Sequence, residues 1–364
     1  MSTLVLLAGL GAVVSWGVVA WVQRRAERLR LVQMPNHRSS HVQPTPHGGG
    51  LGIVLAGTLA GGWLAWGQSL SLWAVTGLAL SLAIVGLLDD IRHLSARVRF
   101  VVQVAVCGGL LVVLGNMPEI AFSPAPLPLR GIEVPEGEGL IIAGWVLSGL
   151  LLLTGVWWIN LFNFMDGIDG LAGSQAVFML LAGAALAAWA HPGAMTSPVW
   201  ILMLCVAAAT VGFLLLNWPP AKIFMGDVGS TWLAFMIFAL ALVSVQAGWL
   251  NYAAWMVLAA VFATDATVTL LTRMTRGEHW HEAHRSHAYQ RLSRRWHGDR
   301  KAGHRSVTLM VSAINLLWLA PLAWACLLWP RWAIAWMAAA YTPIIAGTLF
   351  LGAGKAGEPG TVKP

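Results

Sequence analysis

The sequence predicts an all-α polytopic membrane protein with about eleven transmembrane helices. Of its 364 residues, 58% are hydrophobic and only 10% are charged, and the mean hydropathy is +0.71. A single water-soluble core cannot bury that much apolar surface. Apolar stretches long enough to cross a bilayer recur along the chain, and the segments between them alternate between rich and poor in Lys and Arg.

Each expected helix corresponds to an apolar stretch of about 18–22 residues, the length that spans the hydrocarbon core of a bilayer. The second and third stretches are separated by a turn that is short for two complete crossings. The eleven stretches lie at 3–22, 49–67, 70–88, 98–115, 139–159, 171–190, 198–217, 228–246, 249–271, 308–329 and 331–352.

The distribution of cations predicts that the N-terminus lies outside and the C-terminus lies in the cytoplasm. This orientation puts 20 of the 22 Lys and Arg residues on the cytoplasmic side, where such residues are retained. The opposite side holds Arg130 and Arg331, and its 116–138 segment is rich in Glu and Pro. The net charge of +7 follows mostly from this bias. Anionic lipid and a phosphorylated substrate satisfy it, so we expect no nucleic acid partner.

We expect a single polytopic domain over residues 1–352, with a basic, His-rich cytoplasmic loop at 272–307 and a disordered tail at 353–364. The first apolar stretch has no basic segment before it and no evident cleavage site, so we interpret it as a retained helix. The three cysteines lie in separate apolar stretches, where we expect small buried hydrophobes and no disulfide or zinc site.

Carboxylates are informative in such a chain, because a charge near the bilayer is costly unless it is paired, hydrated or bound to a metal. Asp89 and Asp90 end the third stretch, where negative charge at a helix C-terminus is unfavourable and the two groups repel each other. A structural ion-pair cluster is one interpretation, and a metal or proton-transfer site is the other. The cations available for such a cluster are Arg92, Arg97 and Arg99.

The segment between the fifth and sixth stretches reads NLFNFMDGIDG over 160–170. Asn160 and Asn163 are three residues apart, as are Asp166 and Asp169, so each pair can share one helical face. One Asp is expected to cap the sixth helix, but a cap does not require two Asn and two Asp. The later ligands of an EF-hand are missing, which disfavours a calcium loop.

The segment that opens the eighth stretch reads KIFMGDVGS over 222–230. Lys222 supplies a cation, Phe224 an aromatic ring and Asp227 an oxygen ligand, which together suit phosphate, a base and Mg²⁺. Asp227 can also act as a helix cap. Near the N-terminus, Thr45 precedes three consecutive glycines that can meet either a ligand or another helix.

The basic loop carries His279, His281, His284 and His287 among several Arg residues. The spacing between His281 and His284 is one residue short of a helical zinc-protease motif, so a phosphate group suits this loop better than zinc does. Asp265 lies within a span, where it either has a function or pairs with a neighbouring Arg or Thr.

Together these segments resemble the polyprenyl-phosphate N-acetylhexosamine-1-phosphate transferase family, over about residues 34–307. The resemblance implies that Asp227 binds Mg²⁺, with Mn²⁺ as an alternative. It also implies that Asp89 and Asp90 handle the lipid phosphate and the metal, with His287 as a third catalytic residue. His47 departs from the pattern, since relatives often have Arg there. The residues assigned to substrate binding are Thr45, Asn163, Asp166, Asp169, Lys222, Phe224, His284 and Arg285.

The implied reaction transfers a sugar-1-phosphate from UDP-N-acetylhexosamine to undecaprenyl phosphate in the bacterial inner membrane and releases UMP. The segment from His284 to Gln290 looks like that of enzymes that initiate O-antigen, and thus lipopolysaccharide, synthesis. A longer His-rich signature is missing, which argues against a muramyl-pentapeptide substrate. A homodimer is compatible with this resemblance. A transporter and a lipid phosphatase or pyrophosphatase are the alternative functions, and direct attack or an Asp-linked intermediate are the alternative routes.

Overall fold

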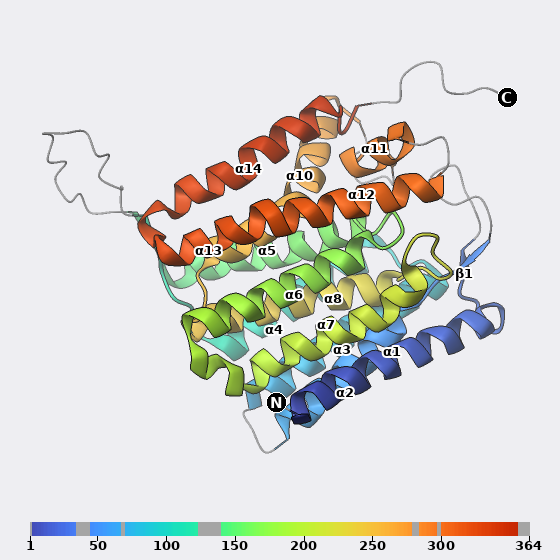
Figure 1. Cartoon of the computed structure of the whole chain (residues 1–364), viewed down its shortest axis with the longest axis horizontal. Helices are drawn as coiled ribbons and strands as arrows, with labels where there is room; N and C mark the ends of the chain where they lie inside the picture. The colour runs from blue at the N-terminus through green and yellow to red at the C-terminus, as the bar shows by residue number, and fades with distance from the viewer. Residues whose placement is uncertain are drawn as a thin grey trace, which may run out of the picture.

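The protein is a bundle of long helices that run side by side along one axis (Figure 1). It is a computed structural model that describes residues 2–33, 44–66, 70–122, 140–278, 284–296 and 300–355. The predicted all-α class is confirmed, because the two short hairpins add only ten strand residues at the bundle ends. In Figure 1 the first hairpin lies at the right-hand end of the bundle, where α1 ends.

The helical elements follow the apolar stretches of the sequence. The α-helices are α1 (Ser2–Leu29), α2 (Gly50–Ala65), α3 (Leu70–Arg92), α4 (Ala96–Leu114), α5 (Gly144–Phe164), α6 (Leu171–Ala190), α7 (Pro198–Asn217), α8 (Asp227–Gln246), α9 (Tyr252–Leu258), α10 (Ala260–Thr275), α11 (Ala288–Trp296), α12 (Arg300–Ile314), α13 (Ala320–Leu328) and α14 (Ala333–Phe350). Short 3₁₀ turns cover Pro192–Thr196 and Pro330–Trp332, and a π-helical turn covers Asn315–Leu319. Strand β1 (Val32–Gln33) pairs antiparallel with β2 (Thr45–Pro46), and β3 (Ile120–Phe122) with β4 (Leu140–Ile142).

Nine helices of the described chain are long and apolar enough to cross a membrane, or ten if the bent pair α9–α10 is one span. The expectation of eleven complete crossings is therefore corrected. Helix α2 has 16 residues, a length of about 24 Å at 1.5 Å per residue, which is short for a hydrocarbon core of about 30 Å. Helices α9 and α10 meet at an angle of 72°.

Polar side chains satisfy the backbone where α9 and α10 separate. The Gln175 amide of α6 donates to the carbonyl of Leu258, the last residue of α9, at 3.0 Å. The Asn315 amide, in the π-helical turn, donates to the Gln175 side-chain oxygen at 2.7 Å. These bonds supply a partner to a carbonyl at the end of α9, so the bend is stabilised from two other helices.

Helix α8 lies at the centre of the bundle, packed chiefly by α3, α5, α2 and α6. Trp232 is completely buried, and the indole of Trp158 on α5 donates to the Ala234 carbonyl at 2.9 Å. The start of α8 carries Asp227, so the packing of this helix fixes the position of a predicted site residue.

Two helices approach the start of α8 closely where glycine removes the side chain. A Cβ atom on Gly50 of α2 would lie 2.2 Å from the Gly229 Cα, and one on Gly86 of α3 would lie 2.6 Å from the Asp227 carbonyl oxygen. Such contacts are far inside van der Waals range. Gly50, the last of the three consecutive glycines, therefore serves helix packing, one of the two alternatives that the sequence left open.

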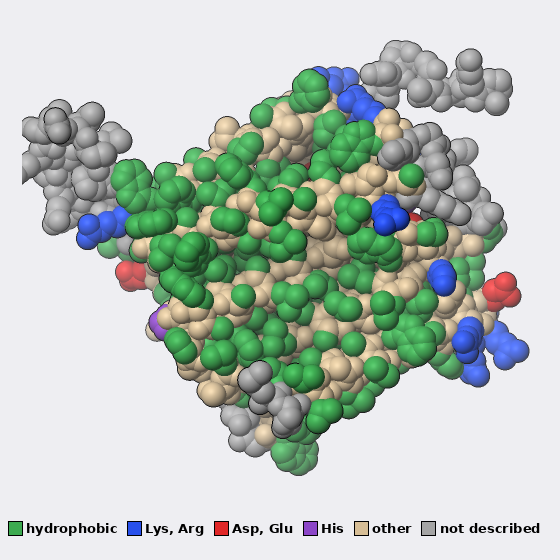
Figure 2. All heavy atoms as spheres, in the orientation of Figure 1, with side chains coloured by type: hydrophobic (Ala, Val, Ile, Leu, Met, Phe, Trp, Pro, Cys, Tyr) green, Lys and Arg blue, Asp and Glu red, His purple; other side chains and the backbone are tan. Residues whose placement is uncertain are grey.

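Hydrophobic side chains cover most of the visible face of the bundle, and Lys and Arg gather mainly toward the right-hand end of the view (Figure 2). Large apolar residues such as Leu317 and Phe350 are 78% and 86% exposed. A lipid environment accounts for such a surface. The cysteines are free and buried, as expected; they are Cys107, Cys205 and Cys326.

Candidate active site

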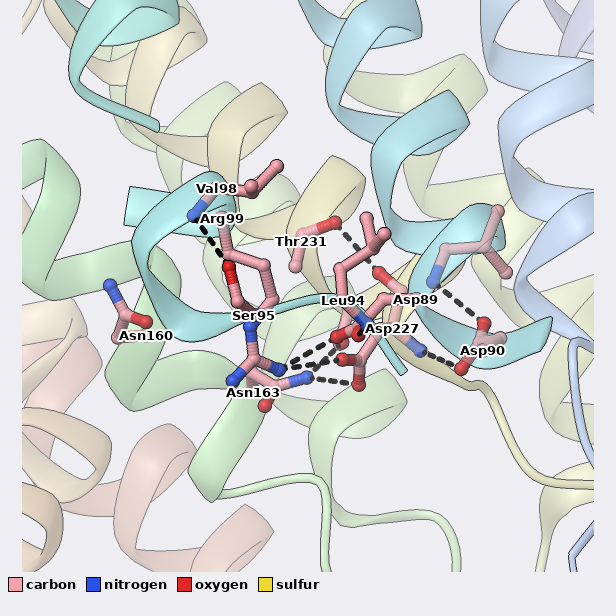
Figure 3. Close-up of polar contacts among 12 residues, drawn as sticks. Asp89, Asp90, Leu94, Ser95, Val98, Arg99, Asn160, Asn163, Asp227 and Thr231 are labelled. Carbon is pink, nitrogen blue, oxygen red and sulfur yellow. Dashed lines mark hydrogen bonds and ion pairs between the residues drawn. The ribbon is translucent and has the colours of Figure 1, made fainter. Parts of the chain in front are cut away.

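The carboxylate of Asp89 is held at the end of α3 by two donors from the turn into α4. The Leu94 backbone amide donates to Oδ1 at 2.6 Å, and the Arg99 guanidinium donates to Oδ2 at 2.7 Å (Figure 3). The Asp89 side chain is 7% exposed and that of Arg99 is 42% exposed. An ion pair with an arginine, one of the two interpretations that the sequence left open, is therefore present, and both oxygens of Asp89 accept hydrogen bonds.

Asp90 links α3 to α8. Its Oδ1 and Oδ2 accept hydrogen bonds from the backbone amides of Asp227 at 3.0 Å and Val228 at 3.1 Å. Amides in the first turn of a helix have no partner in that helix, and the helix dipole there favours negative charge. Since Gly226 at the N-cap position has no side chain, Asp90 supplies the cap from another helix. His47 Nδ1 lies 3.8 Å from Asp90 Oδ1.

Asp227 is the most accessible of these three carboxylates, with 29% of its side chain exposed. Its Oδ1 accepts a hydrogen bond from the Asn163 amide at 2.8 Å, and Arg99 lies 3.6 Å from its Oδ2. The Asn163 amide also donates to Ser230 Oγ at 2.8 Å. Figure 3 shows Asp89, Arg99, Asn163 and Asp227 converging from α3, α4, α5 and α8.

Asp166 lies just after α5, where burial raises the pKa of its carboxyl well above the usual range. The negative charges of Asp227, Asp90 and Asp169 raise this pKa further. Among the described residues no hydrogen-bond donor to this carboxylate offsets these effects. We call Asp89, Asp90, Asp166 and Asp227 the carboxylate cluster.

The donor set suits Mg²⁺ held jointly by protein and substrate. In the described parts of the chain, no group of three or more His, Cys, Asp or Glu side chains could hold a metal ion by itself. Mg²⁺ commonly binds one or two carboxylates and completes its coordination with water and substrate phosphates. Asp166 and Asp227 are hard oxygen donors whose charges raise each other's energy, so a cation between them would relieve repulsion.

Asp169 braces the loops around the cluster. Its Oδ2 accepts from the Ala221 backbone amide at 2.9 Å, and its Oδ1 lies 3.2 Å from His304 Nδ1 on α12. The Asp169 carbonyl accepts from Thr308 at 3.1 Å. These contacts give Asp169 a structural role that the sequence did not predict, since it was expected among the substrate-binding residues.

The segment before α2 pairs with the segment before α8. The Phe224 amide donates to the Pro46 carbonyl at 2.9 Å, and the Gly49 amide donates to the Phe224 carbonyl at 2.8 Å. Phe224 is partly exposed and Lys222 is exposed, so both side chains are accessible to a ligand. Thr45 lies next to Pro46 in β2, which places the N-terminal motif against the motif that contains Asp227.

The histidine motif is anchored by Asp265. The Asp265 carboxylate accepts from the Ala288 and Tyr289 backbone amides, each at 2.9 Å, and lies 3.3 Å from His287 Nδ1. His284 stacks on His287 with 4.8 Å between ring centroids. Thus Asp265 pairs with His287 and caps α11, while Arg273 forms a salt bridge to Glu278 at 2.7 Å.

Helix α11 is also tied to the carboxylate cluster and to the end of α14. The Tyr289 hydroxyl donates to the Phe164 carbonyl at 3.0 Å, directly beside the Asn163–Asp166 segment. Arg291 donates to the carbonyls of Leu351 and Lys355, so its guanidinium is engaged in packing. Residues 353–355, expected in a disordered tail, therefore belong to the folded body. Arg285 is exposed.

Sequence reasoning paired Asn160 with Asn163, but the structure separates their roles. Asn160 exchanges hydrogen bonds with Gln103 of α4 and donates to the Val156 carbonyl, whereas Asn163 reaches Asp227. Arg99 was considered only as a structural partner, although it faces two carboxylates. His279 and His281 lie outside the described residues.

Comparison with known proteins assigns the chain to a family. The profile of glycosyl transferase family 4 matches residues 72–245. A probable undecaprenyl-phosphate N-acetylglucosaminyl 1-phosphate transferase of Bacillus subtilis (strain 168) is 30% identical over 276 residues, which are 74% of this chain and 72% of that protein. The chain belongs to glycosyl transferase family 4.

Other family 4 relatives differ in the sugar that their names carry. A decaprenyl-phosphate N-acetylglucosaminephosphotransferase of Mycolicibacterium smegmatis (strain ATCC 700084 / mc(2)155) is 33% identical over 64% of this chain and 58% of its own length. A phospho-N-acetylmuramoyl-pentapeptide-transferase of Synechococcus sp. (strain JA-3-3Ab) is 32% identical over 73% of this chain and 74% of its own. The expected family is therefore confirmed: this is a multi-pass membrane enzyme of the polyprenyl-phosphate sugar-1-phosphate transferases.

Proposed function

We propose that this family 4 enzyme transfers N-acetylhexosamine-1-phosphate from a UDP-sugar to undecaprenyl phosphate, yielding undecaprenyl diphosphate-sugar and UMP. The observation that carries the proposal is the meeting of the carboxylate cluster with Asn163 and Arg99 at one end of the bundle. Two phosphate groups must approach each other in this reaction, which requires cations and oxygen ligands for a metal.

Mg²⁺, with Mn²⁺ as an alternative, is the proposed cofactor. Asp227 and Asp166 would hold the ion. Arg99 lies 3.6 Å from the Asp227 carboxylate, and Asp166 is buried among negative charges, so a second cation would offset repulsion at both groups. The ion would neutralise the diphosphate of the UDP-sugar and the departing UMP. Arg99 carries a permanent positive charge beside Asp89 and Asp227, and it would contact a phosphate oxygen when substrate enters.

Direct attack by the lipid phosphate fits the contacts of Asp89. A covalent route would use a carboxylate oxygen as the nucleophile, and the hydrogen bonds from Leu94 and Arg99 lower the nucleophilicity of both oxygens. A phosphate monoester is largely ionised at neutral pH, so it needs little help from a base. We assign Asp89 the role of orienting Arg99 and the incoming phosphate.

The base of the nucleotide would pack against Phe224, whose ring is partly exposed beside the cluster. Lys222 and Arg285 are exposed cations that suit the diphosphate, and Thr45 adjoins the same pair of loops. Asn163, near the end of α5, donates hydrogen bonds to Asp227 and Ser230, so it lies beside the proposed metal ligand.

We further propose that this end of the bundle faces the cytoplasm of a bacterial inner membrane, with the N-terminus outside. The excess of Lys and Arg in the segments at that end supports the orientation. Initiation of O-antigen or another cell-surface polysaccharide is the pathway that fits the histidine motif. A transporter is disfavoured, because its polar residues would lie near the middle of the helices rather than at one end.

The decisive experiment measures UMP release by the purified enzyme with and without undecaprenyl phosphate, using UDP-N-acetylglucosamine, UDP-N-acetylgalactosamine and UDP-N-acetylmuramoyl-pentapeptide in parallel. We expect UMP with one of the first two sugars, only when the lipid is present, and no UMP after chelation. UMP release without lipid would indicate a hydrolase, and turnover of the pentapeptide substrate would refute the sugar assignment. Full activity in chelator would refute the metal.

A further inference from the structure

Asp265 is a buried carboxylate, 4% exposed, to which four donors point. The Ala288 amide donates to Oδ1 and the Tyr289 amide to Oδ2, while Thr269 Oγ1 lies 3.1 Å from Oδ1. His287 Nδ1 lies 3.3 Å from Oδ1. A protonated carboxyl would place its hydrogen against one of these donors, so the arrangement requires an ionised, accept-only Asp265.

An ionised Asp265 defines the tautomer of His287. Because the carboxylate can only accept, Nδ1 of His287 must carry the hydrogen. The ring is 4% exposed and stacks with two others, with centroid distances of 4.8 Å to His284 and 5.6 Å to Tyr289. His287 is therefore buried, packed against two rings and fixed at one edge, which leaves it little freedom to move toward a substrate.

His284 is the accessible member of the histidine pair. Its Nδ1 lies 3.4 Å from the Ser286 backbone amide, which can only donate, and 3.0 Å from Ser286 Oγ. The hydrogen of a neutral His284 is therefore on Nε2. Burial lowers the pKa of His284 to about 4, so the ring is neutral at physiological pH.

We propose that Asp265 is a positioning residue of the transferase: it fixes His287 and the first turn of α11, and through the stacked rings it holds His284 so that Nε2–H faces the substrate phosphate. This inference rests on the proposed function, since it names the group that the histidine motif presents. His287, assigned a catalytic role from the sequence, becomes the link between Asp265 and His284.

Two substitutions at His287 separate its two nitrogens. In His287→Asn the amide nitrogen can occupy the place of Nδ1 and donate to Asp265, whereas in His287→Gln the amide reaches the place of Nε2 and leaves Asp265 without its donor. If His287 only links Asp265 to His284, His287→Asn retains more turnover than His287→Gln. The reverse order would mean that Nε2 of His287 touches the substrate, and would overturn the proposal.

A double-mutant cycle tests whether Asp265 acts through His284. Removal of a group that orients a functional histidine lowers rates by about 10- to 100-fold at metal sites, and we expect a loss of that order in kcat for Asp265→Asn. In the His284→Ala background the same substitution should change kcat less than about threefold. Equal losses in both backgrounds would assign Asp265 a purely structural role.

Arg291→Gln is the matched control for the docking of α11. Arg291 ties this helix to the Leu351 and Lys355 carbonyls and does not contact the histidine stack. We expect Arg291→Gln to lower the melting temperature while kcat stays within about threefold of the parent enzyme. If it reproduces the kcat loss of Asp265→Asn, loose docking of α11 explains both, and the positioning role is wrong.

The tautomers give a readout that does not depend on activity. In ¹⁵N-histidine spectra of the full-length protein, signals lost in His287→Ala and His284→Ala identify the two rings. We expect Nδ1–H for His287, Nε2–H for His284, and a mixture at His287 in Asp265→Asn. Nε2–H at His287 in the parent protein would overturn the inference even if transfer is confirmed. If the parent protein transfers no phosphosugar but shows these tautomers, the proposed function is wrong, while the hydrogen bond between Asp265 and His287 is confirmed.

Discussion

The Asp90 carboxylate accepts hydrogen bonds from the first two backbone amides of α8, including that of Asp227 at 3.0 Å. One member of the carboxylate cluster therefore caps the helix that presents another. A charge at position 90 thus has a structural effect on α8, in addition to any effect on substrate.

Asp90→Asn and Asp227→Asn should differ in stability although both lower turnover. Asn at position 90 keeps one acceptor oxygen but turns its NH₂ group toward the other amide, and a buried donor left without an acceptor costs about 1–3 kcal/mol, so Asp90→Asn should lower the melting temperature. The Asp227 side chain is partly exposed, and Asn can keep its contact with Asn163, so Asp227→Asn should leave the melting temperature nearly unchanged while turnover falls at least about 100-fold. Thermal unfolding in detergent and UMP release measure the two effects. Equal melting temperatures in both variants would contradict the capping role.

Gly86→Ala should destabilise the protein, whereas Gly77→Ala on the same helix should not. A methyl group on Gly86 would lie 2.6 Å from the Asp227 carbonyl oxygen, and overpacking of this kind costs about 1–3 kcal/mol. Nothing lies within 4 Å of a Cβ on Gly77, where Ala favours the helix by about 0.5–1 kcal/mol. Melting temperatures of the two variants check the contrast. A normal melting temperature for Gly86→Ala would show that α3 and α8 are farther apart.

Cysteine labelling tests the orientation. The native cysteines are buried, so a membrane-impermeant thiol reagent should react with introduced residues and not with the native ones. We expect Ser95→Cys, Ala221→Cys and Ala302→Cys to be labelled only from the cytoplasm, and Ser123→Cys only from the periplasm. Labelling of Ala302→Cys from outside would put the histidine motif on the wrong face for a nucleotide substrate.

The lowered pKa of His284 predicts an acid-dependent loss of stability. A histidine whose pKa is near 6.5 when unfolded and about 4 when folded binds more protons in the unfolded state. Its contribution to stability is complete above about pH 6.5 and falls as the pH approaches 4. The melting temperature of His284→Gln should therefore decline less than that of the parent between these values. Parallel declines would indicate that His284 titrates normally.

The sequence predicted the parts of the fold that depend on local composition. Apolar stretches became helices, and Asn163 and Asp227, which the resemblance assigned to one site from two separate motifs, form a hydrogen bond. Composition could not reveal that α2 is too short for a complete crossing or that α9 and α10 meet at 72°, because Gly-rich and apolar residues fit a buried helix and a lipid-facing span equally well.

The capping roles of Asp90 and Asp265 depend on distant partners. Asp90 bonds an amide 137 residues away, and Asp265 bonds amides 23 and 24 residues away, across a connection with no helical periodicity. Sequence spacing shows which residues share a helix face but not which helix end will lie beside a carboxylate. The contacts of Asp169 could not be predicted for the same reason, since its partners Ala221 and His304 lie on separate segments.

The central place of α8 has a consequence for how the enzyme is made. The helices that pack most extensively on α8, namely α2, α3, α5 and α6, all precede it in the described chain. When α8 leaves the ribosome, its neighbours have already been synthesised. Asp227 can therefore form its hydrogen bonds with Asp90 and Asn163 as soon as α8 packs. The histidine motif lies later in the chain, directly before α11, and is therefore synthesised after these groups. Truncated chains ending after α8 would therefore contain the proposed metal ligands before the proposed phosphate-binding segment exists.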